Sequence, residues 1–206
     1  MSIVPHWATM TNRRYWEREA HGPKLGHIRE ALGVTGEGIR IVAIADTHGR
    51  PHPNLGACID ELQPGHILHA GDVGSLDVLR DLENRASVTA VRGNVDGRDL
   101  PDLATVDVRH DGSSVIKILI THVALAGLKL RADVGRIATA EGASLVVCGH
   151  SHVPFAAQEG AIAVFNPGSA GPRRFRLPIV LGVIEVSARG LSLRHIDCET
   201  GLAWIP

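Results

Sequence analysis

Short apolar runs recur along this 206-residue chain, and five of them end directly at aspartate, asparagine or histidine. In the first, residues 41–45 are followed by Asp46 and His48, and turn-forming residues come next. A run of this length predicts a buried strand. The runs 66–70, 88–92, 116–121 and 145–148 end at Gly71-Asp72, Gly93-Asn94, His122 and Gly149-His150-Ser151-His152. Core packing requires none of these polar residues, and open α/β sheets bind ligands at the carboxyl ends of their strands.

In the first half of the chain, predicted strands alternate with predicted helices. Strands are expected at 39–45, 67–70 and 88–91, and helices at 54–62 and 75–84, the second with Ser75 as its N-cap. Such alternation favours a largely parallel sheet with helices on both faces.

The second half of the chain does not keep this regular alternation of strands and helices. Its pattern predicts strands 104–109 and 115–120 as a hairpin turning at Asp111-Gly112, then a helix over 128–140 and a strand over 145–148. The remaining runs, 161–165, 179–186 and 191–196, are typical of antiparallel strands. Together the two halves predict an α/β sandwich with a mixed sheet in one domain.

Residues 1–38 differ in character from the rest of the chain. They hold Trp7, Tyr15 and Trp16 beside a mixed charged stretch, with short helices expected there and over 25–32, and glycines then indicate a linker. We therefore expect an N-terminal extension over 1–38 and a single domain over 39–206. A surface arm, a flap over the site and a dimer contact all fit the extension, so a homo-oligomer stays open.

Composition narrows the function classes. The net charge of −1 argues against a basic face that binds long nucleic acid. Three widely spaced cysteines form no disulfide framework, which favours a reducing compartment, and we expect the cytoplasm. The start carries no charged-then-apolar leader, and no apolar stretch is long enough to span a bilayer, so we expect no membrane contact.

The residues at the strand exits form a candidate metal-ligand set: Asp46, His48, Asp72, Asn94, His122, His150 and His152. Seven protein groups with added water suffice for two ions. Carboxylate, imidazole and amide ligands without thiolate suit manganese, which we expect first, or nickel, iron or zinc. A carboxylate that bridges two cations is the usual basis of such a pair. We assign the bridge to Asp72, because its strand would lie between those that lead to Asp46 and Asn94.

In this order, these motifs resemble the calcineurin-like metallophosphoesterase signature. Three stretches resemble its compact single-domain phosphodiesterases of bacteria and archaea: His69-Ala70-Gly71-Asp72, Val91-Arg92-Gly93-Asn94 with Asp96, and Asn166-Pro167-Gly168-Ser169 followed by Pro172-Arg173. The resemblance covers residue 39 to the C-terminus. It implies a four-layer α/β/β/α sandwich of mixed sheets flanked by helices, with a dimetal site.

The resemblance also implies roles for single residues. One ion would take Asp46, His48, Asp72 and His152, and the other would take Asp72, Asn94, His122 and His150. A hydroxide that bridges the ions would attack the phosphorus of a small phosphodiester or other phosphate ester. Asn94 would also contact the substrate, Asp96 would act from beside the ligands or as an acid, and Arg173 would hold the phosphate. No side-chain nucleophile is then needed.

This chain departs from the family pattern at two positions. Many relatives carry histidine where Val95 follows the motif asparagine, and many carry a second histidine where this chain has Ala124. Valine donates no proton, so we expect weak activity on poor leaving groups such as alkyl monoesters, and phosphodiesters rather than monoesters as substrates.

Two other interpretations compete with that of a metal-dependent phosphodiesterase. A related fold serves as a protein-interaction scaffold in a membrane-trafficking coat, where the ligand positions are altered, whereas here every ligand position is filled. A nucleotide-binding α/β domain fits poorly, because neither a G-x-G-x-x-G nor a Walker pattern follows the first strand. Among the other histidines, we expect His69 as a buried neighbour of the site and His195 at the surface.

Overall fold

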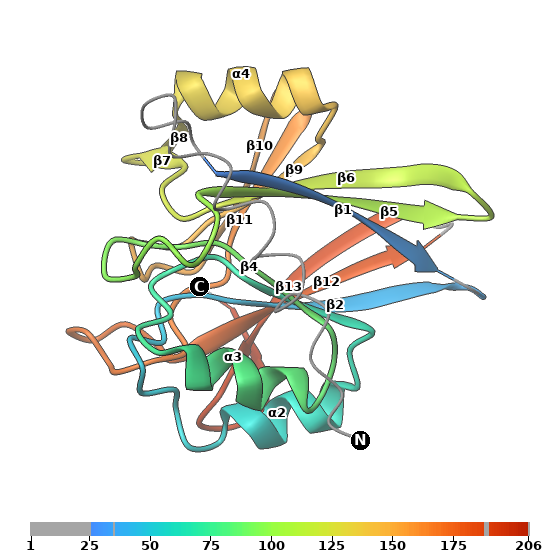
Figure 1. Ribbon diagram of the computed structural model, residues 1–206. Coiled ribbons are helices and arrows are strands. Elements are labelled where there is room, and N and C mark those ends of the chain that lie inside the picture. The colour runs from blue at the N-terminus through green and yellow to red at the C-terminus, as the bar shows by residue number, and fades with distance from the viewer. Residues whose placement is uncertain (1–25, 35, 188–189, 206) are drawn as a thin grey trace.

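The computed structural model describes residues 26–34, 36–187 and 190–205. Two six-stranded mixed sheets pack face to face, with helices on the outside (Figure 1). The first sheet has the order β1 (His27–Val34), β5 (Leu103–His110), β6 (Ser113–Thr121), β9 (Leu145–Val147), β11 (Ile162–Asn166) and β10 (Phe155–Glu159). The second has the order β14 (Ala203–Trp204), β13 (Gly190–Asp197), β12 (Val180–Ser187), β2 (Gly38–Ile44), β3 (His66–His69) and β4 (Val88–Ala90).

The helices complete the four layers. Helices α2 (Leu55–Leu62) and α3 (Leu76–Glu83) cover the second sheet, and α4 (Ala132–Glu141) covers the first (Figure 1). Ser75 caps α3 as predicted, because its side chain accepts a hydrogen bond from the backbone N–H of Asp77. The α/β/β/α architecture implied by the family resemblance is therefore confirmed.

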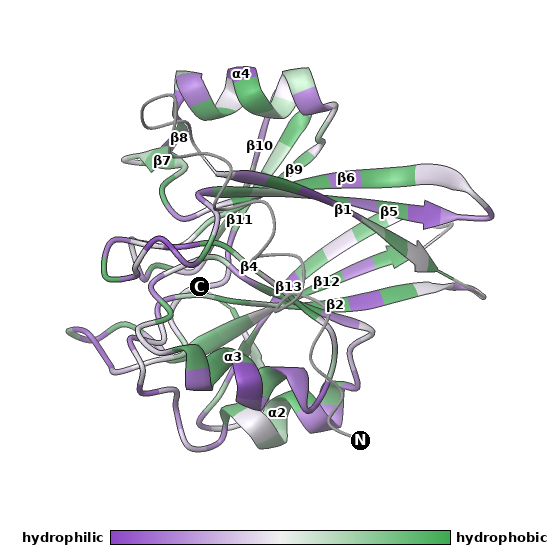
Figure 2. Cartoon of the chain, in the orientation of Figure 1, coloured by the Kyte–Doolittle hydropathy of each residue, from purple (hydrophilic) through white to green (hydrophobic). Residues whose placement is uncertain are grey.

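The core has three parts that follow from the two-residue period of the strands. In β2, Ile41 and Ala43 face the first sheet, whereas Val42 and Ile44 face the helices. Burial on both faces explains why these strands read as continuous apolar runs (Figure 2). A third apolar cluster fills the space between α4 and the first sheet.

The expectation of one parallel sheet with helices on both faces was wrong. Strands β2, β3 and β4 are parallel, as predicted. However, they lie in sequential order across the sheet, so right-handed crossovers put α2 and α3 on the same face. The first sheet covers the other face.

One predicted helix begins later than expected, and another is a strand. The helix expected over 128–140 begins at Ala132, because β7 (Leu125–Ala126) and β8 (Lys129–Leu130) form a small hairpin around Gly127. The helix expected over 25–32 is strand β1, which pairs in parallel with β5 along its whole length. The boundary after residue 38 stays a prediction, and residues 1–25, with their aromatic side chains and expected helix, lie outside the described residues.

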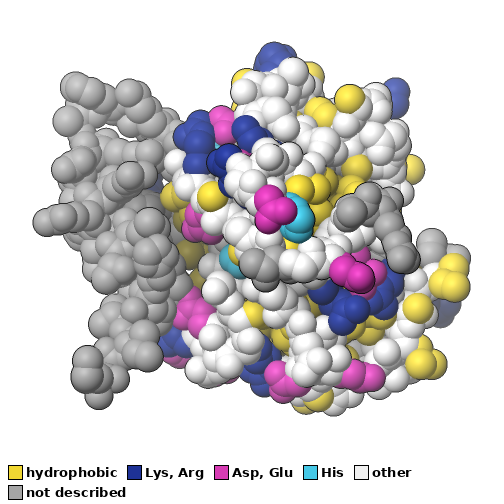
Figure 3. Space-filling model, turned by 90° about the vertical axis from the view of Figure 1, so that its right-hand side faces the viewer, with side chains coloured by type: hydrophobic (Ala, Val, Ile, Leu, Met, Phe, Trp, Pro, Cys, Tyr) yellow, Lys and Arg dark blue, Asp and Glu magenta, His cyan; other side chains and the backbone are white. Residues whose placement is uncertain are grey.

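The charge on one face and the character of the helices bear on possible partners. Basic and acidic side chains are interspersed on the face that Figure 3 shows, in keeping with the near-zero net charge. Within the described ranges, none of the helices combines the length and the apolar character that a membrane crossing would require.

Candidate metal centre

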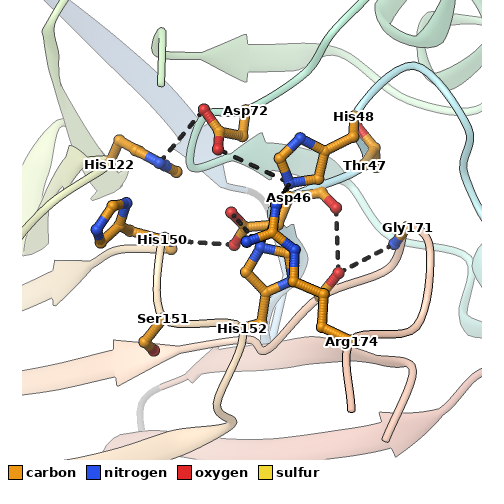
Figure 4. A network of polar contacts seen from close by, with 12 residues as sticks. Asp46, Thr47, His48, Asp72, His122, His150, Ser151, His152, Gly171 and Arg174 are labelled. Carbon is orange, nitrogen blue, oxygen red and sulfur yellow. Dashed lines mark hydrogen bonds and ion pairs between the residues drawn. The ribbon is translucent and has the colours of Figure 1, made fainter. Parts of the chain in front are cut away.

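One end of the sandwich gathers the carboxyl ends of five strands from both sheets (Figure 4). Strands β2, β3 and β4 lead to Asp46, Asp72 and Asn94, and strands β6 and β9 lead to His122, His150 and His152. Backbone hydrogen bonds hold these exits together: Asp46 N–H donates to the Gly71 carbonyl at 3.0 Å, and His48 N–H donates to the Asp72 carbonyl at 2.8 Å. Residues distant in sequence therefore meet because their strands end together.

Five of the predicted ligands form what we call the ligand cluster: Asp46, His48, Asp72, His122 and His152. Their ligand atoms fall into two groups, Asp46 with His48 and His152, and Asp46 with Asp72 and His122. Within each group, one ligand atom per residue lies within 4.8 Å of the others. This spacing suits one cation in each group.

Both carboxylates link the two groups. Asp46 belongs to both, and its Oδ1 lies 3.3 Å from Nε2 of His152. Asp72 lies between them, with Oδ1 3.4 Å from Nε2 of His122 and Oδ2 3.8 Å from Nε2 of His48. Strand β3 does lie between β2 and β4, as the assignment of the bridge to Asp72 assumed. The bridging role itself stays a prediction.

The ligands stand in unusual backbone conformations. Among the described non-glycine residues with positive φ are five predicted ligands: Asp46 (56°), His48 (49°), Asp72 (53°), His150 (71°) and His152 (60°). Left-handed backbone is uncommon outside glycine, and it concentrates where function constrains the chain. The sharp turns let the peptide leave each strand while the side chain stays aimed at the cluster.

Glycines beside the ligands allow the close packing. A Cβ on Gly71 would lie 2.8 Å from Nδ1 of His122, and a Cβ on Gly149 would lie 2.9 Å from Oδ2 of Asp46. A Cβ on Gly93 would overlap the carboxylate of Asp72. The Gly-Asp, Gly-Asn and Gly-His motifs are therefore needed for the close approach of the strand exits.

The donor set fits a cation. Asp46 Oδ1 and His122 Nε2 are buried and lack hydrogen-bond partners, a costly state that a bound ion would relieve. Burial, with the neighbouring charge of Asp72, raises the pKa of Asp46 to about 8. Burial lowers the pKa of His48, His122 and His152, the last to about 4, which keeps these imidazoles in the neutral form that binds metals.

His150 and Asn94 lie at the exposed side of the cluster. The His150 ring meets the His122 ring edge-on, with centroids 5.2 Å apart, and its backbone N–H donates to Oδ2 of Asp46 at 3.0 Å. After Asn94, the backbone N–H of Val95 donates to Oδ1 of Asp72 at 3.1 Å. Both residues are thus adjacent to the group that contains Asp72 and His122.

Asp96 ties two of the loops together. Its carboxylate accepts hydrogen bonds from the backbone N–H groups of Val73 (3.0 Å), Gly74 (2.7 Å) and Gly93 (2.8 Å). These bonds fix the exit of β3 against the exit of β4. The geometry gives Asp96 a positioning role, and its role as an acid stays a prediction.

The two arginines after Pro172 differ in their contacts. Arg173 donates to the Leu177 carbonyl at 2.7 Å and pairs with Glu199, so its contacts lie away from the ligand cluster. Arg174 instead places its NH2 3.3 Å from Nε2 of His48 (Figure 4). The family resemblance singled out Arg173, whereas in the structure Arg174 is the arginine that contacts a residue of the ligand cluster.

A second set of residues braces the site from behind. His69 is fully buried and lies 2.9 Å from the Thr47 hydroxyl, as its prediction as a buried neighbour required. The amide of Asn166 donates to the Gly149 carbonyl at 2.8 Å, and the Ser169 hydroxyl donates to the Asp46 carbonyl at 3.1 Å. The Asn-Pro-Gly-Ser stretch was the available signal for this bracing.

Known proteins resemble this chain in sequence. A model of the calcineurin-like phosphoesterase superfamily domain matches residues 39–189. A probable metallophosphoesterase from Methanocaldococcus jannaschii is 31% identical over 150 residues, which cover 69% of this chain and 76% of the relative.

Solved structures share the fold. Yfce, a phosphoesterase from E. coli, matches with a TM-score of 0.59 and 22% identity, covering 81% of this chain and 97% of that one. Vps29 from Entamoeba histolytica, solved in complex with Zn²⁺, matches with a TM-score of 0.64 and 17% identity, covering 81% of this chain and 96% of that one.

Proposed function

Because the chain belongs to the calcineurin-like phosphoesterase superfamily, we propose that it hydrolyses small phosphodiesters with two divalent ions held at the ligand cluster. One observation carries the proposal: two groups of ligand atoms share Asp46 and meet across Asp72, and the buried Asp46 Oδ1 and His122 Nε2 make no hydrogen bond. A bound cation would satisfy both atoms.

The residues divide the work in the proposed reaction. Divalent ions held here supply positive charge at the phosphate oxygens and lower the pKa of an attacking water. Asp46 and Asp72 provide the negative charge that retains the ions, and the neutral imidazoles of His48, His122 and His152 complete the ligand groups. Asn94, at the exposed side, offers an amide to a phosphate oxygen. We expect manganese first, with nickel, iron or zinc as alternatives.

The valine at position 95 is a reason to expect diesters with good leaving groups as substrates. It follows Asn94 at the cluster, and 57% of its surface is exposed, so a proton donor at this position would face the substrate. Valine cannot protonate a departing alkoxide. Ala124, at the second altered position, is buried in the apolar cluster beneath α4 and contributes no polar group either.

The fold likeness to Vps29 keeps a scaffold in view as the second candidate. The filled ligand set argues for catalysis, since a scaffold has no need to bury unpaired metal-binding atoms. The near-zero net charge favours a small substrate over long nucleic acid.

Hydrolysis of bis-p-nitrophenyl phosphate by metal-stripped protein tests the proposal, with Mn²⁺, Ni²⁺, Zn²⁺ and Mg²⁺ restored one at a time. We expect metal-dependent turnover in the wild type and in a His110→Ala control, whose histidine lies at the far hairpin, but not in His122→Ala. If the protein binds metal but shows no turnover with any of these ions, the phosphodiesterase proposal is wrong and the scaffold role is favoured.

A further inference from the structure

The loop that carries Arg174 contains an unexplained strained residue. Eight described non-glycine residues have positive φ, and five of them are the predicted ligands. Gln63 is the left-handed cap of α2, and Asp111 turns the β5–β6 hairpin. The eighth is Phe175, with φ of 53°. A bulky aromatic residue is a genuine outlier in this conformation, and neither a helix cap nor a hairpin accounts for it.

Phe175 occupies the position of a tight turn that glycine usually takes. The Leu177 N–H donates to the Arg174 carbonyl at 3.1 Å, which makes Phe175 the first central residue of a four-residue turn. Turns with positive φ at that position strongly prefer glycine, asparagine or aspartate. Arg173 holds the turn from outside through the Leu177 carbonyl and Glu199.

The ring does not serve the core. Phe175 is 93% exposed, in a chain with three phenylalanines in all. Its neighbour Arg174 has its guanidinium beside His48, so the ring is attached one residue from a group in contact with the ligand cluster. Consecutive Cα atoms are about 3.8 Å apart, so the backbone of Phe175 lies directly beside that of Arg174.

Two other exposed apolar side chains also follow site residues directly. Val95, 57% exposed, comes after Asn94, and Val153, 41% exposed, comes after His152. Together with Phe175 they give three separate loops an apolar side chain next to a polar site residue. Exposed apolar side chains on these loops would suit a substrate whose phosphate carries an apolar group.

We propose that the turn at Arg174-Phe175 is a substrate-recognition element, in which Arg174 contacts the phosphate oxygens and Phe175 stacks on a planar ring of the diester. The inference rests on the phosphodiesterase function proposed above and specifies its substrate class: a phosphodiester that carries a nucleobase or another planar aromatic group. A guanidinium fork matches phosphate oxygens, and a nucleobase presents a π-face to an aromatic side chain whatever its sequence. The strained turn holds the two side chains apart: the Arg174 guanidinium lies beside His48 of the ligand cluster, and the Phe175 ring is exposed to solvent.

The test compares two esters with the same leaving group: the p-nitrophenyl esters of thymidine 5′-phosphate and of methyl phosphate. A third ester, of phenyl phosphate, separates a nucleobase from a simple aryl ring. We expect the wild type to prefer the thymidine ester in kcat/KM and Phe175→Ala to lower that preference about tenfold. Val115→Ala, which removes an exposed apolar side chain at the far hairpin, should keep the wild-type preference.

Binding gives a readout that does not depend on turnover. By calorimetry with Mn²⁺ present, Phe175→Ala should weaken thymidine 5′-phosphate about tenfold more than it weakens methyl phosphate, and Arg174→Ala should weaken both ligands alike. Phe175→Gly removes the ring but suits the turn, so it should behave like Phe175→Ala.

The outcomes separate this inference from the proposed function. If Phe175→Gly keeps the wild-type preference, or if Phe175→Ala leaves the preference unchanged, the stacking role is wrong while the diesterase stands. If the wild type hydrolyses neither the methyl nor the thymidine ester with any metal, the proposed function fails first. A preference for the phenyl ester equal to that for the thymidine ester would point to a simple aryl group.

Discussion

The two ends of the sandwich turn the chain between strands with different residues. At the end away from the ligands, positive φ falls on Gly36, on Asp111-Gly112 in the β5–β6 hairpin, and on Gly190 at the start of β13. At the ligand end it also falls on glycines such as Gly71 and Gly74, but in addition on five predicted ligands, which are aspartates and histidines. Glycine adopts this backbone at no steric cost, whereas other residues do so under strain. The difference teaches that strain marks the positions where a particular side chain is needed.

The largest expected effect on catalysis comes from comparing an aspartate at the ligand end of the sandwich with an aspartate at the opposite end. Asp72 and Asp111 both have positive φ, but Asp72 contacts His48 and His122, and Asp111 is an exposed turn residue. We expect Asp72→Asn to lower metal-dependent kcat/KM at least about 100-fold, because even residues behind metal ligands cost 10–100-fold. Asp111→Asn should stay within about twofold of the wild type, since surface substitutions have small effects. Equal effects at both ends would remove the distinction.

Glycines provide the second contrast. Gly93 has no positive φ, yet a Cβ there would overlap the carboxylate of Asp72, whereas Gly112 has φ of +78° and open space around it. Gly93→Ala should therefore lower kcat/KM about 10–100-fold by shifting Asp72. Gly112→Ala should lower the free energy of unfolding by about 1 kcal/mol and leave kinetics alone. Steady-state kinetics and urea unfolding distinguish the two.

The pH dependence of stability separates a structural histidine from the ligands. His66 lies at the start of β3, bonded to the Thr89 hydroxyl at 2.8 Å, and burial lowers its pKa to about 4. An unfolded histidine has a pKa of about 6.5. Between these values only the unfolded chain binds the proton, so the free energy of unfolding falls as pH falls.

From pH 7 to pH 5 this one group should remove about 2 kcal/mol of stability. His66→Gln should lose that part of the pH dependence, which urea unfolding at both pH values measures. An unchanged slope in the variant would mean that His66 is protonated in the folded protein.

The smallest expected effect is a gain at the site. Val95→His places an imidazole at the exposed position after Asn94, where it could protonate a leaving oxygen. General acids contribute 10²–10⁴-fold when ideally placed, so we expect about a tenfold rise in hydrolysis of glycerol phosphate relative to nitrophenyl esters. Val115→His at the far hairpin is the matched control. Efficient hydrolysis of glycerol phosphate by the wild type would contradict the interpretation that Val95 leaves the site without a proton donor for the leaving group.

The sequence named five residues that the structure brings together at one end of the sandwich, although it misplaced some of the elements around them. The candidate ligands could be found because each lies within a few residues of the end of an apolar run, and parallel strands bring their carboxyl ends to one edge. Arg174 could not be chosen over Arg173, because their difference lies in the direction of two neighbouring side chains on a turn.

Tertiary contacts explain the errors in the fold. The run that forms β1 contains Arg29, Glu30 and Leu32, all good helix formers, but its pairing with β5 outweighs that local preference. His195, predicted at the surface, is buried against the Phe165 ring and lies 2.8 Å from the Asn166 carbonyl. The burial and the hydrogen-bond partner of a polar residue on a strand depend on how the two sheets stack, which the sequence pattern does not give.

The central claim is that the ligand cluster holds two divalent ions. Crystals of the protein grown with Mn²⁺ and measured at the manganese absorption edge test it most directly. We predict two anomalous peaks roughly 3.5–4 Å apart, one among Asp46, His48 and His152 and the other beside Asp72 and His122. A single peak, or manganese bound elsewhere with the cluster empty, would contradict the claim.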